Sequence, residues 1–406
     1  MAATRQAFAR FVREQEVCGD RPEANRARGG NGRGLPGDDT QTLLKTIFVV
    51  DPLARHQTDL ARALGAQYRV KTFSDTVTAK AAAKADLPSL IMVAESAPPD
   101  GGLAAIQHLK ATLGNRAIGF IGMTRDPASF FAESCRREKI PFLVKPVSNH
   151  ALFDLITKSI SQPIEDRWAT LGDNERRALV QTVELFRALP DQILSGEPVQ
   201  YDHIKDSCGP LVTAVCNNKL SDVLSGVKGH DNYTYVHSFR IAVFLSHFGH
   251  ELGLRDDDLL TLSTGGLIHD LGKVAIPHQV LNKPGKLTDD EWTIMKTHVD
   301  RGLEVIDCIE DVPRGVVTIA AQHHEKMDGT GYPRGLKAAE LNELARMSAI
   351  VDVFGALTDE RIYKPPHPPD KALAIMRDMG PNHLDQHLLG LFREMLLDTA
   401  SYLADV

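Results

Sequence analysis

Four short apolar runs between residues 43 and 160 constrain the fold of this chain most strongly. Polar, alanine-rich segments of helical character separate them, and in order they read KTIFVVD, PSLIMVAE, AIGFIGMT and IPFLVKP. Strands that alternate with helices in this way are typical of a parallel sheet covered by helices. The sequence therefore predicts an α/β domain over residues 43–160.

A second region, from residue 229 to 406, has long helical periodicity and few strand signals, which predicts an all-α domain. Residues 161–228 also look helical, and we expect them to link the two domains. An apolar stripe in this linker ends at Pro190 and fits either a short seam that would join a homodimer or ordinary core packing. Its members, at near-heptad spacing, are Leu171, Ala178, Thr182, Leu185 and Leu189.

The composition excludes several classes of protein. Residues 1–42 include the glycine- and arginine-rich NRARGGNGRGLPGDD, which predicts a disordered tail. A net charge of -7 argues against a nucleic-acid binder. The five cysteines are never paired as CxxC, which argues against a disulfide framework and fits a reducing cytoplasm. Because no apolar run approaches the roughly 18–20 residues that span a bilayer, we expect no membrane segment.

Three positions of the α/β region carry a resemblance to response-regulator receiver domains. Asp51 and Thr124 end two of the apolar runs, and Lys145 ends another. The resemblance implies a flavodoxin-like parallel sheet, but it places Ala94 at the phosphoacceptor position and Pro52 at the second acidic position. Alanine cannot accept a phosphoryl group, and one carboxylate is a poor magnesium site. We therefore expect a pseudo-receiver that works by protein contact; an α/β domain without a regulatory role is the alternative.

Histidine and aspartate residues recur through the C-terminal region, about one helix and its connection apart. Singly, each has an ordinary explanation, because a lone histidine is usually a hydrogen-bonded core residue and a lone aspartate is often a cap. Together they fit a bundle whose successive helices aim ligands at one centre. The candidates are His237, His269, Asp270, His298, His323, His324 and Asp352.

Local patterns suggest how some of these side chains are placed. His237 lies one turn before Ile241 on an apolar helix face and is expected to point inward. Asp352 lies within an apolar helix, where a carboxylate needs a compensating partner. Adjacent helical residues diverge by about 100°, so His323 and His324 serve one site only near a helix end or between two metals.

Two further signals concern helix ends in the same region. Gly272 suits a helix C-terminus, which would leave His269 and Asp270 at an end where side chains converge. Thr288 and Glu291 have the spacing of a capping box. They would begin a helix with His298 beside its apolar face, and the residues of that face are Trp292, Met295, Val299, Gly302 and Ile306.

The candidate ligands offer imidazole nitrogen and carboxylate oxygen but no thiolate. This donor set favours borderline to hard metals, with iron or manganese expected first and zinc or nickel as alternatives. Seven ligands are too many for one tetrahedral ion. We therefore expect two divalent metal ions.

These residues carry a close resemblance to the HD-GYP family of cyclic dinucleotide phosphodiesterases. The matching segments are HDNYTYVHS, HDLGK, His298, HHEKMDGTGYP and Asp352 followed by ALTDERIYK. The resemblance implies an HD-superfamily helical domain that opens cyclic di-GMP to pGpG and further to GMP, with the seven candidates as metal ligands and Asp270 bridging. Some family members hold a third metal through a glutamate where this chain has Tyr233.

The same resemblance implies roles around the metals. From its own position four residues after His269, beside the HD pair, Lys273 is placed to reach a nonbridging phosphate oxygen and to act with Asp270 in catalysis; a surface lysine is the alternative. Arg361 and Lys364 match positions that hold the substrate's phosphates, although a solvated basic loop explains them equally well. Tyr332, in the GYP loop, would contact substrate or a partner such as a diguanylate cyclase; a purely structural turn is the alternative.

Three further points stay open at the level of the sequence. Asp328 would orient a ligand histidine from outside the ligand set, whereas Glu325 has no assigned role. A weakly active or inactive cyclic-dinucleotide-binding regulator is one alternative function, because Gly355 stands where an aspartate is common in the family. Another HD-type nucleotide phosphohydrolase is a second alternative, which the GYP loop and the second histidine group disfavour.

Overall fold

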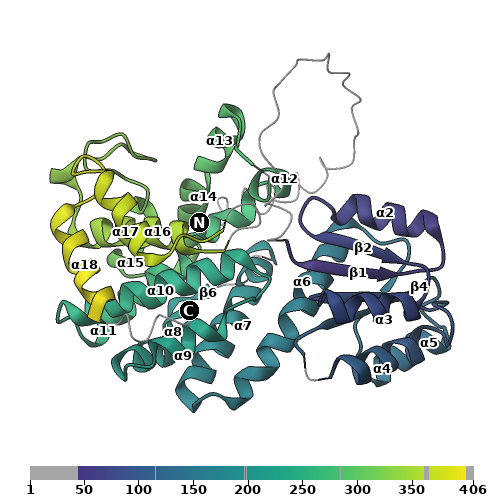
Figure 1. Ribbon diagram of the computed structural model, residues 1–406. Coiled ribbons are helices and arrows are strands. Elements are labelled where there is room, and N and C mark those ends of the chain that lie inside the picture. The colour runs from purple at the N-terminus through teal and green to yellow at the C-terminus, as the bar shows by residue number, and fades with distance from the viewer. Residues whose placement is uncertain are drawn as a thin grey trace.

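The structure is a computed structural model and describes residues 44–398 apart from 115, 196, 198, 284 and 361–364. Figure 1 shows an α/β part, in purple and blue, beside a helical part in green and yellow. The predicted tail over residues 1–42 and the basic residues Arg361 and Lys364 lie outside the described residues. Within the described part, no helix is long and apolar enough to cross a membrane.

The N-terminal sheet is parallel throughout, and its strand order is β2-β1-β3-β4-β5, which is the flavodoxin-like order. This confirms the predicted fold class of the region. The strands are β1 (Thr46–Val50), β2 (Arg69–Phe73), β3 (Leu90–Ala94), β4 (Gly119–Thr124) and β5 (Phe142–Val144). The helices are α2 (Ala54–Leu64), α3 (Thr76–Ala85), α4 (Gly102–Leu113), α5 (Phe130–Arg137) and α6 (Asn149–Glu165).

Helices cover both faces of this sheet, so its central strands are apolar throughout. On β1, Phe48 and Val50 join one buried cluster, while Ile47 and Val49 join another on the opposite face. Successive side chains of a strand point to opposite faces, and a sheet covered twice therefore needs continuous apolar runs. Strand β2 lies at the edge, and none of its residues is fully buried. Because β2 has no continuous apolar run, the sequence did not predict this strand.

The remaining elements are almost all helical. The linker contains η3 (Asp166–Thr170), α7 (Asp173–Ser195), β6 (Val199–Gln200), α8 (Tyr201–Cys216) and α9 (Leu220–Gly226). The following elements are α10 (Tyr233–Glu251), α11 (Asp256–Ile268), η4 (Leu271–Ala275), α12 (His278–Leu281), α13 (Asp289–Lys296), α14 (His298–Ile306) and β7 (Ile309–Glu310). The last are α15 (Arg314–Gln322), η5 (Ala338–Glu340), α16 (Glu343–Thr358), α17 (Pro369–Asp378) and α18 (Gln386–Asp398).

The apolar stripe of the linker packs into the core of the same chain. Helix α7 continues through Pro190 to Ser195, so the prediction that proline ends it was wrong. Ala178 and Leu189 are fully buried in the cluster that also contains residues of α10. Thr182 lies within hydrogen-bonding distance of the Tyr235 hydroxyl, at 3.1 Å. Ordinary core packing therefore accounts for the stripe.

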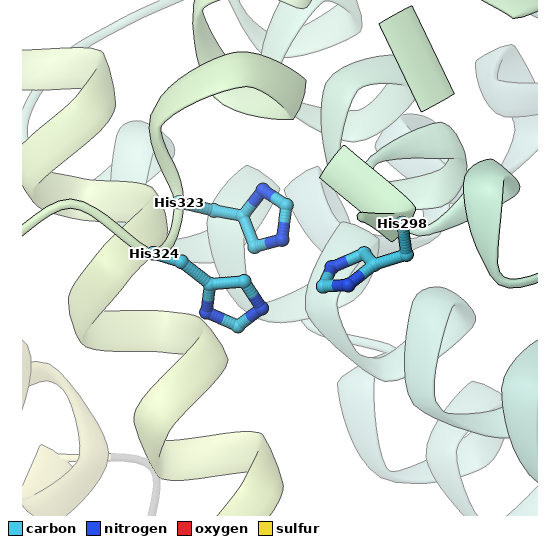
Figure 2. Close-up of side chains that lie close together, drawn as sticks. All are labelled: His298, His323 and His324. Atoms are coloured by element: carbon cyan, nitrogen blue, oxygen red, sulfur yellow. The ribbon is translucent and has the colours of Figure 1, made fainter. Parts of the chain in front are cut away.

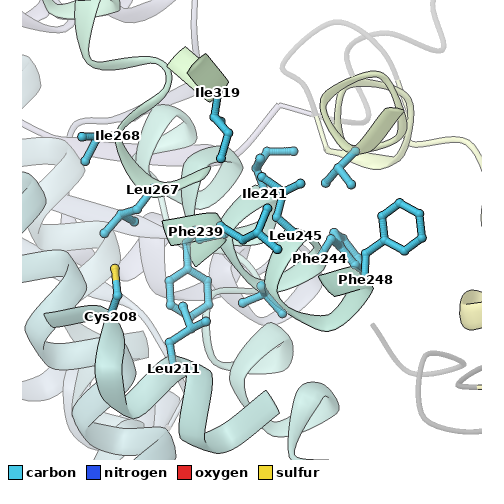
Figure 3. Packing of buried hydrophobic residues seen from close by; sticks show 14 of the residues in the cluster. Cys208, Leu211, Phe239, Ile241, Phe244, Leu245, Phe248, Leu267, Ile268 and Ile319 are labelled. Carbon is cyan, nitrogen blue, oxygen red and sulfur yellow. The ribbon is translucent and has the colours of Figure 1, made fainter. Parts of the chain in front are cut away.

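Helix α10 runs through the middle of the helical core. Figure 3 shows Phe239, Ile241 and Phe248 of this helix among side chains from its neighbours. A helix that is apolar on every side is buried on every side. Helices α10 and α11 approach closely at Gly266, where an added Cβ would lie 2.8 Å from the backbone of Ala242. This close contact fixes where the end of α11 lies relative to α10.

The α/β part contacts the loop that leads into α10. The carboxylate of Asp231 accepts hydrogen bonds from the Lys45 ammonium at 2.9 Å and from the Tyr68 hydroxyl at 2.7 Å. The Asp231 backbone N–H donates to the Ser161 hydroxyl at 3.1 Å. The start of α10 is therefore held by side chains from both ends of the α/β region.

Candidate metal centre

Three of the candidate histidines lie where a helix ends. His269 caps the C-terminus of α11, and His323 caps the C-terminus of α15. His298 follows the end of α13 and is the first residue of α14. Figure 2 shows His323 and His324 on one side of a small space and His298 on the other, with their rings turned toward one another.

These helix ends also fix the orientation of the rings. The Nδ1 atoms of His269, His298 and His323 lie 2.7 to 2.9 Å from the carbonyl oxygens of Gly266, Met295 and Ala320 respectively. Carbonyls in the last turn of a helix lack an intrahelical donor, so they are free to accept. An Nδ1–H that donates to a carbonyl leaves the lone pair on Nε2, which is how proteins orient metal-binding histidines.

The carboxylate of Asp270 lies at the centre of these rings. Its oxygens lie 3.3 Å from Nε2 of both His269 and His298, 3.6 Å from Nε2 of His237 and 4.0 Å from Nε2 of His323. Burial alone would raise the pKa of Asp270, but Lys273 and the surrounding imidazoles hold it well below its usual value. A buried anion therefore faces four imidazole nitrogens.

Several polar atoms of this centre have no protein partner. Within the described residues, Nε2 of His269, His298 and His323 and Oδ1 of Asp270 are buried without a hydrogen bond. Leaving such a group unpaired costs about 1–3 kcal/mol each. Burial, together with neighbouring His324, keeps the pKa of His323 well below its usual value, so the ring is neutral and its lone pair is available. This donor set fits a divalent cation placed among these atoms.

The other end of the centre is built around His237 on α10. Its Nε2 lies 3.1 Å from Oδ1 of Asp352, and its Nδ1 lies 2.6 Å from Oδ2 of Asp359. Burial lowers the pKa of His237, but the two carboxylates outweigh it and raise the value to about 9. Arg240 Nε lies 2.7 Å from the other oxygen of Asp359.

Asp359 was not among the residues predicted from the sequence. It lies seven residues after Asp352, which places the two carboxylates two helical turns apart on the same side. This seven-residue spacing is the sequence pattern from which Asp359 could have been predicted. The position of His237 between them depends on how α10 packs against α16, which the sequence alone did not provide.

The predicted ligands form three overlapping groups. In each group one possible ligand atom per residue lies within 4.8 Å of the others, and the described residues give these combinations: His298 with His323 and His324, His237 with His269 and Asp352, and His269 with Asp270 and His323. His324 also lies near Asp352, with Nδ1 3.4 Å from Oδ2, and burial lowers its pKa to about 4. The structure thus brings all seven candidates together.

The loop that follows His324 is held by Glu325. This buried carboxylate accepts hydrogen bonds from the backbone N–H groups of Arg334 at 2.7 Å and Leu336 at 3.0 Å. The role of Glu325, which the sequence left unassigned, is therefore to anchor the GYP loop. The ring of Tyr332 in this loop lies over His324, with centroids 4.7 Å apart, and meets Trp292 edge-on at 6.0 Å.

The structure does not bring Asp328 to the histidines. Its carboxylate is exposed and accepts two hydrogen bonds from Thr330, through the backbone N–H at 2.8 Å and the hydroxyl at 2.7 Å. The prediction that Asp328 orients a ligand histidine was therefore wrong. Short-range turn geometry explains this residue instead.

Lys273 lies at the edge of the centre, where its ammonium donates to the Asp270 carboxylate. Gly272 was predicted to suit the C-terminus of a helix, and this prediction was wrong. This glycine lies in η4, has no positive φ, and does not end a helix. An added Cβ at Gly272 would lie 1.9 Å from the carbonyl oxygen of His298, so glycine is needed for the close approach of η4 to α14.

The helix predicted to begin at the capping box is two helices. The capping box of Thr288 and Glu291 is present, but α13 ends at Lys296 and α14 begins at His298. Trp292 was expected on the buried face, yet its side chain is 46% exposed. The break at Thr297 changes the direction of the apolar face, and it places His298 where its Nδ1 reaches a free carbonyl.

The receiver-like positions form a second polar pocket, in the α/β domain. Asp51 follows β1 and accepts hydrogen bonds from the Lys145 ammonium at 2.8 Å and the Leu53 backbone N–H at 2.9 Å, and the His56 ring lies 3.1 Å away. Ala94 is the last residue of β3. The next residue, Glu95, accepts a hydrogen bond from Thr124.

Comparison with known proteins identifies the helical region. Residues 214–388 match a family model described as "HD domain". A cyclic di-GMP phosphodiesterase from Pseudomonas aeruginosa is 33% identical over 218 residues, which cover 53% of this chain and 51% of that protein. A 3'3'-cGAMP-specific phosphodiesterase from Vibrio cholerae is 35% identical over 275 residues, covering 65% and 59%. The chain thus spans about half to three fifths of these relatives.

Among solved structures, the receiver domain of a sensor histidine kinase from Pseudomonas aeruginosa matches at 22% identity with a TM-score of 0.27, covering 29% of this chain and 97% of that domain. The match to the HD-domain family covers the helical region, and it includes the helices that carry the candidate histidines and aspartates or end at them, which are α10, α11, α14, α15 and α16. Residues 214–388 of this chain are therefore an HD domain, and this domain contains all seven candidate ligands.

Proposed function

We propose that this chain is a metal-dependent phosphodiesterase that hydrolyses a cyclic dinucleotide, with cyclic di-GMP as the expected substrate. The observation that carries the proposal is the group of buried imidazole and carboxylate atoms around Asp270 that lack partners among the described residues. The names of the relatives, which are cyclic di-GMP and cGAMP phosphodiesterases, support the substrate class.

Two divalent ions, iron or manganese first, would occupy the centre. Their chemistry would be to lower the pKa of a bound water and to neutralise phosphate oxygens. His298, His323 and His324 would hold one ion, and His237, His269 and Asp352 would hold the other. Asp270 would be shared, because it lies within 4.0 Å of nitrogens from both groups.

A third ion beside His237 is disfavoured by Tyr233. The ring of Tyr233 stacks on His237, with centroids 6.0 Å apart and planes 13° from parallel. This aromatic side chain fills the position from which a glutamate would offer an oxygen ligand. The two-ion count therefore remains our proposal.

Lys273 and Tyr332 would bind the substrate at the mouth of the centre. Lys273 is partly exposed, and its ammonium lies against Asp270, so a phosphate placed there would meet a positive charge. Tyr332 lies over His324 and presents an aromatic ring to a nucleotide base. Arg361 and Lys364 remain predicted phosphate contacts, and they lie outside the described residues.

The position of Asp359 supports an active enzyme over an inactive binding protein. Glycine at 355 removes a carboxylate that is common in the family, yet Asp359 supplies one to Nδ1 of His237. An added Cβ at Gly355 would lie 3.5 Å from the His237 ring, so the two positions serve the same imidazole. The orientation of His237 is retained by a different residue.

The linear product pGpG, its further hydrolysis to GMP and the choice between cyclic di-GMP and cyclic GMP-AMP are finer parts of the same proposal. We also propose that the α/β domain acts through protein contact, since Ala94 cannot be phosphorylated. A diguanylate cyclase or another signalling protein that docks on the GYP loop or the α/β domain is the expected partner. The apolar stripe that suggested a homodimer packs into this chain's own core, so it does not support a dimer.

The test uses the full chain without an affinity tag, prepared anaerobically and loaded with ferrous iron or manganese. It is incubated separately with cyclic di-GMP, 3'3'-cGAMP and cyclic di-AMP, and the products are separated by chromatography. We expect linear dinucleotide from at least one guanine-containing substrate, and none after the metal is removed with a chelator. Absence of hydrolysis by protein that contains two metal ions per chain would overturn the proposal. Hydrolysis that survives complete metal removal would also contradict it.

A further inference from the structure

A second group of metal-binding side chains lies at the far end of α10, away from the centre described above. His247, His250 and Glu251 occupy its last two turns. His247 follows His237 by ten residues, which is roughly 15 Å along a helix. The group therefore shares a helix with the first centre but no ligand.

The spacing of the group places all three side chains on one helix face. His250 lies three residues and Glu251 four residues after His247, and side chains at these intervals are neighbours on a helix. One possible ligand atom from each residue lies within 4.8 Å of the other two. Here the three-residue interval joins two imidazoles, and the four-residue interval joins the His247 imidazole to the Glu251 carboxylate.

His247 supplies an independent observation that points to a ligand. Its side chain is 3% exposed, and neither ring nitrogen has a hydrogen-bond partner within the described part of the chain. A buried imidazole without any partner is costly. Burial lowers its pKa, so the ring is neutral and offers a lone pair.

The other two residues leave the group open to solvent. The side chain of His250 is 24% exposed and that of Glu251 is 46% exposed. Nδ1 of His250 lies 3.6 Å from Oε1 of Glu251, which is longer than a hydrogen bond. These two groups therefore do not satisfy each other, and both reach solvent one helical turn from the buried His247.

We propose that His247, His250 and Glu251 bind a divalent transition-metal ion at the surface of the HD domain. Two imidazoles and one carboxylate, with water completing the coordination, suit zinc, nickel or copper rather than magnesium or calcium. The three ligand atoms converge only while α10 stays helical to its end. Binding therefore stabilises this end of the helix, since an ion that binds only the folded state shifts the unfolding equilibrium. The proposal does not depend on the activity of the first centre.

The test measures zinc bound by untagged full-length chain, by equilibrium dialysis, after the first centre is disabled with Asp270→Asn. Two proteins are compared in that background: the Asp270→Asn chain itself and the same chain with His250→Ala and Glu251→Gln. Glu251 is exposed and His250 is partly exposed, and both added substitutions leave the buried His247 in place. His108→Ala is the matched control, because His108 is an exposed histidine 3.2 Å from the carboxylate of Asp100 but belongs to none of the three-residue groups found among the described residues.

We expect the triple variant to bind one zinc ion fewer than Asp270→Asn, and His108→Ala to leave the count unchanged. Zinc should also raise the midpoint of thermal unfolding of Asp270→Asn but not that of the triple variant. Equal zinc counts in the two proteins would overturn the proposal, whatever the count is. In the otherwise native chain, His250→Ala with Glu251→Gln should leave hydrolysis at the first centre unchanged.

Discussion

Two buried aspartates, Asp51 in the α/β domain and Asp270 in the HD domain, are each 1% exposed, and each lies against a lysine. They differ in what else surrounds them. The oxygens of Asp51 are taken by Lys145, by the Leu53 N–H and by the adjacent His56. Oδ1 of Asp270 instead faces imidazole nitrogens that also lack partners within the described residues. The pocket around Asp51 is complete without a ligand, whereas the one around Asp270 is not.

Charge does not distinguish the two pockets. Burial raises the pKa of Asp51, but the hydrogen bonds from Lys145 and the Leu53 N–H outweigh it and leave the value below the usual one. Asp270 is likewise held as an anion, by Lys273 and the imidazoles. The pockets differ in the number of possible metal-ligand atoms that have no hydrogen-bond partner among the described residues. A buried carboxylate indicates a metal site only when neighbouring groups also have lone pairs that accept no hydrogen bond.

The largest expected effect comes from removing the charge of each aspartate in turn. Asp270→Asn should lose the metal bound at the centre around Asp270 and lower the rate of hydrolysis on the order of 10³-fold or more, as expected for a group on which the whole site depends. Asp51→Asn should change the metal content and the rate less than twofold, roughly the scatter of such assays. Elemental analysis and product chromatography measure both. Equal losses in the two variants would remove the distinction between the pockets.

A smaller effect is expected from Asp359, which contacts His237, a proposed ligand, and is not itself a proposed ligand. Asp359→Asn removes the charge that holds Nδ1 of His237, and we expect a loss of about 10–100-fold in metal affinity or activity. Glu360→Gln, at the exposed neighbouring position, is the matched control. Titration of metal-free protein with manganese gives the affinity. A variant that binds metal as tightly as the native chain would show that His237 needs no carboxylate there.

The sequence predicted those parts of the site that depend on local pattern. Seven candidate ligands could be found because each lies next to a helix signal or a motif. A helix end was one of the two arrangements considered for His323 and His324, and α15 does end at this pair. The break at Thr297 and the pairing of His237 with Asp359 could not be found in the same way. Both depend on how helices pack across the domain, and neither leaves a periodic signal.

The GYP loop gives the next prediction, through its anchor Glu325. Glu325→Ala leaves the N–H groups of Arg334 and Leu336 without an acceptor, which costs about 1–3 kcal/mol each if they stay buried. We expect a lower urea midpoint and a KM that rises about threefold to tenfold, or roughly 0.7–1.4 kcal/mol of lost binding. Asp328→Ala, which removes side-chain hydrogen bonds from Thr330 alone, should change both quantities less. The anchor role would be wrong if Asp328→Ala had the greater effect.

Glu325 also shows why residue type alone was insufficient. Its place between two candidate ligand histidines and the GYP loop left its role open in the sequence. In the structure its carboxylate accepts hydrogen bonds from the backbone of the loop. A buried acid can serve a metal, a base or a backbone turn, and only the direction of its side chain decides among them. Asp328 was misassigned for the same reason.

The smallest effect on function is expected from the Asp51 pocket, where the consequence is stability. At neutral pH, Asp51→Asn should lower the free energy of unfolding by about 1–3 kcal/mol, because the Lys145 ammonium loses its charged acceptor. Since the folded pKa of Asp51 lies below the usual 3.8, its contribution is present above that pH and is lost as pH falls through the folded value. The difference between native and variant protein should therefore shrink in acid.

Urea denaturation at several pH values measures this dependence. Asp59→Asn is the control, since Asp59 is an exposed acid 3.9 Å from Arg55 on α2 and should contribute little at any pH. A difference that grows as the pH falls would mean that the folded protein favours protonated Asp51, against the hydrogen bonds described above.

The central claim is that the atoms around Asp270 bind metal while those around Asp51 do not. Anomalous diffraction from crystals of manganese-loaded protein, recorded where manganese scatters anomalously, locates each ion directly. We expect peaks within coordination distance, about 2.0–2.3 Å, of Asp270 and the imidazole nitrogens facing it, and none beside Asp51. A peak at Asp51, or none at Asp270 in protein that retains manganese, would contradict the account.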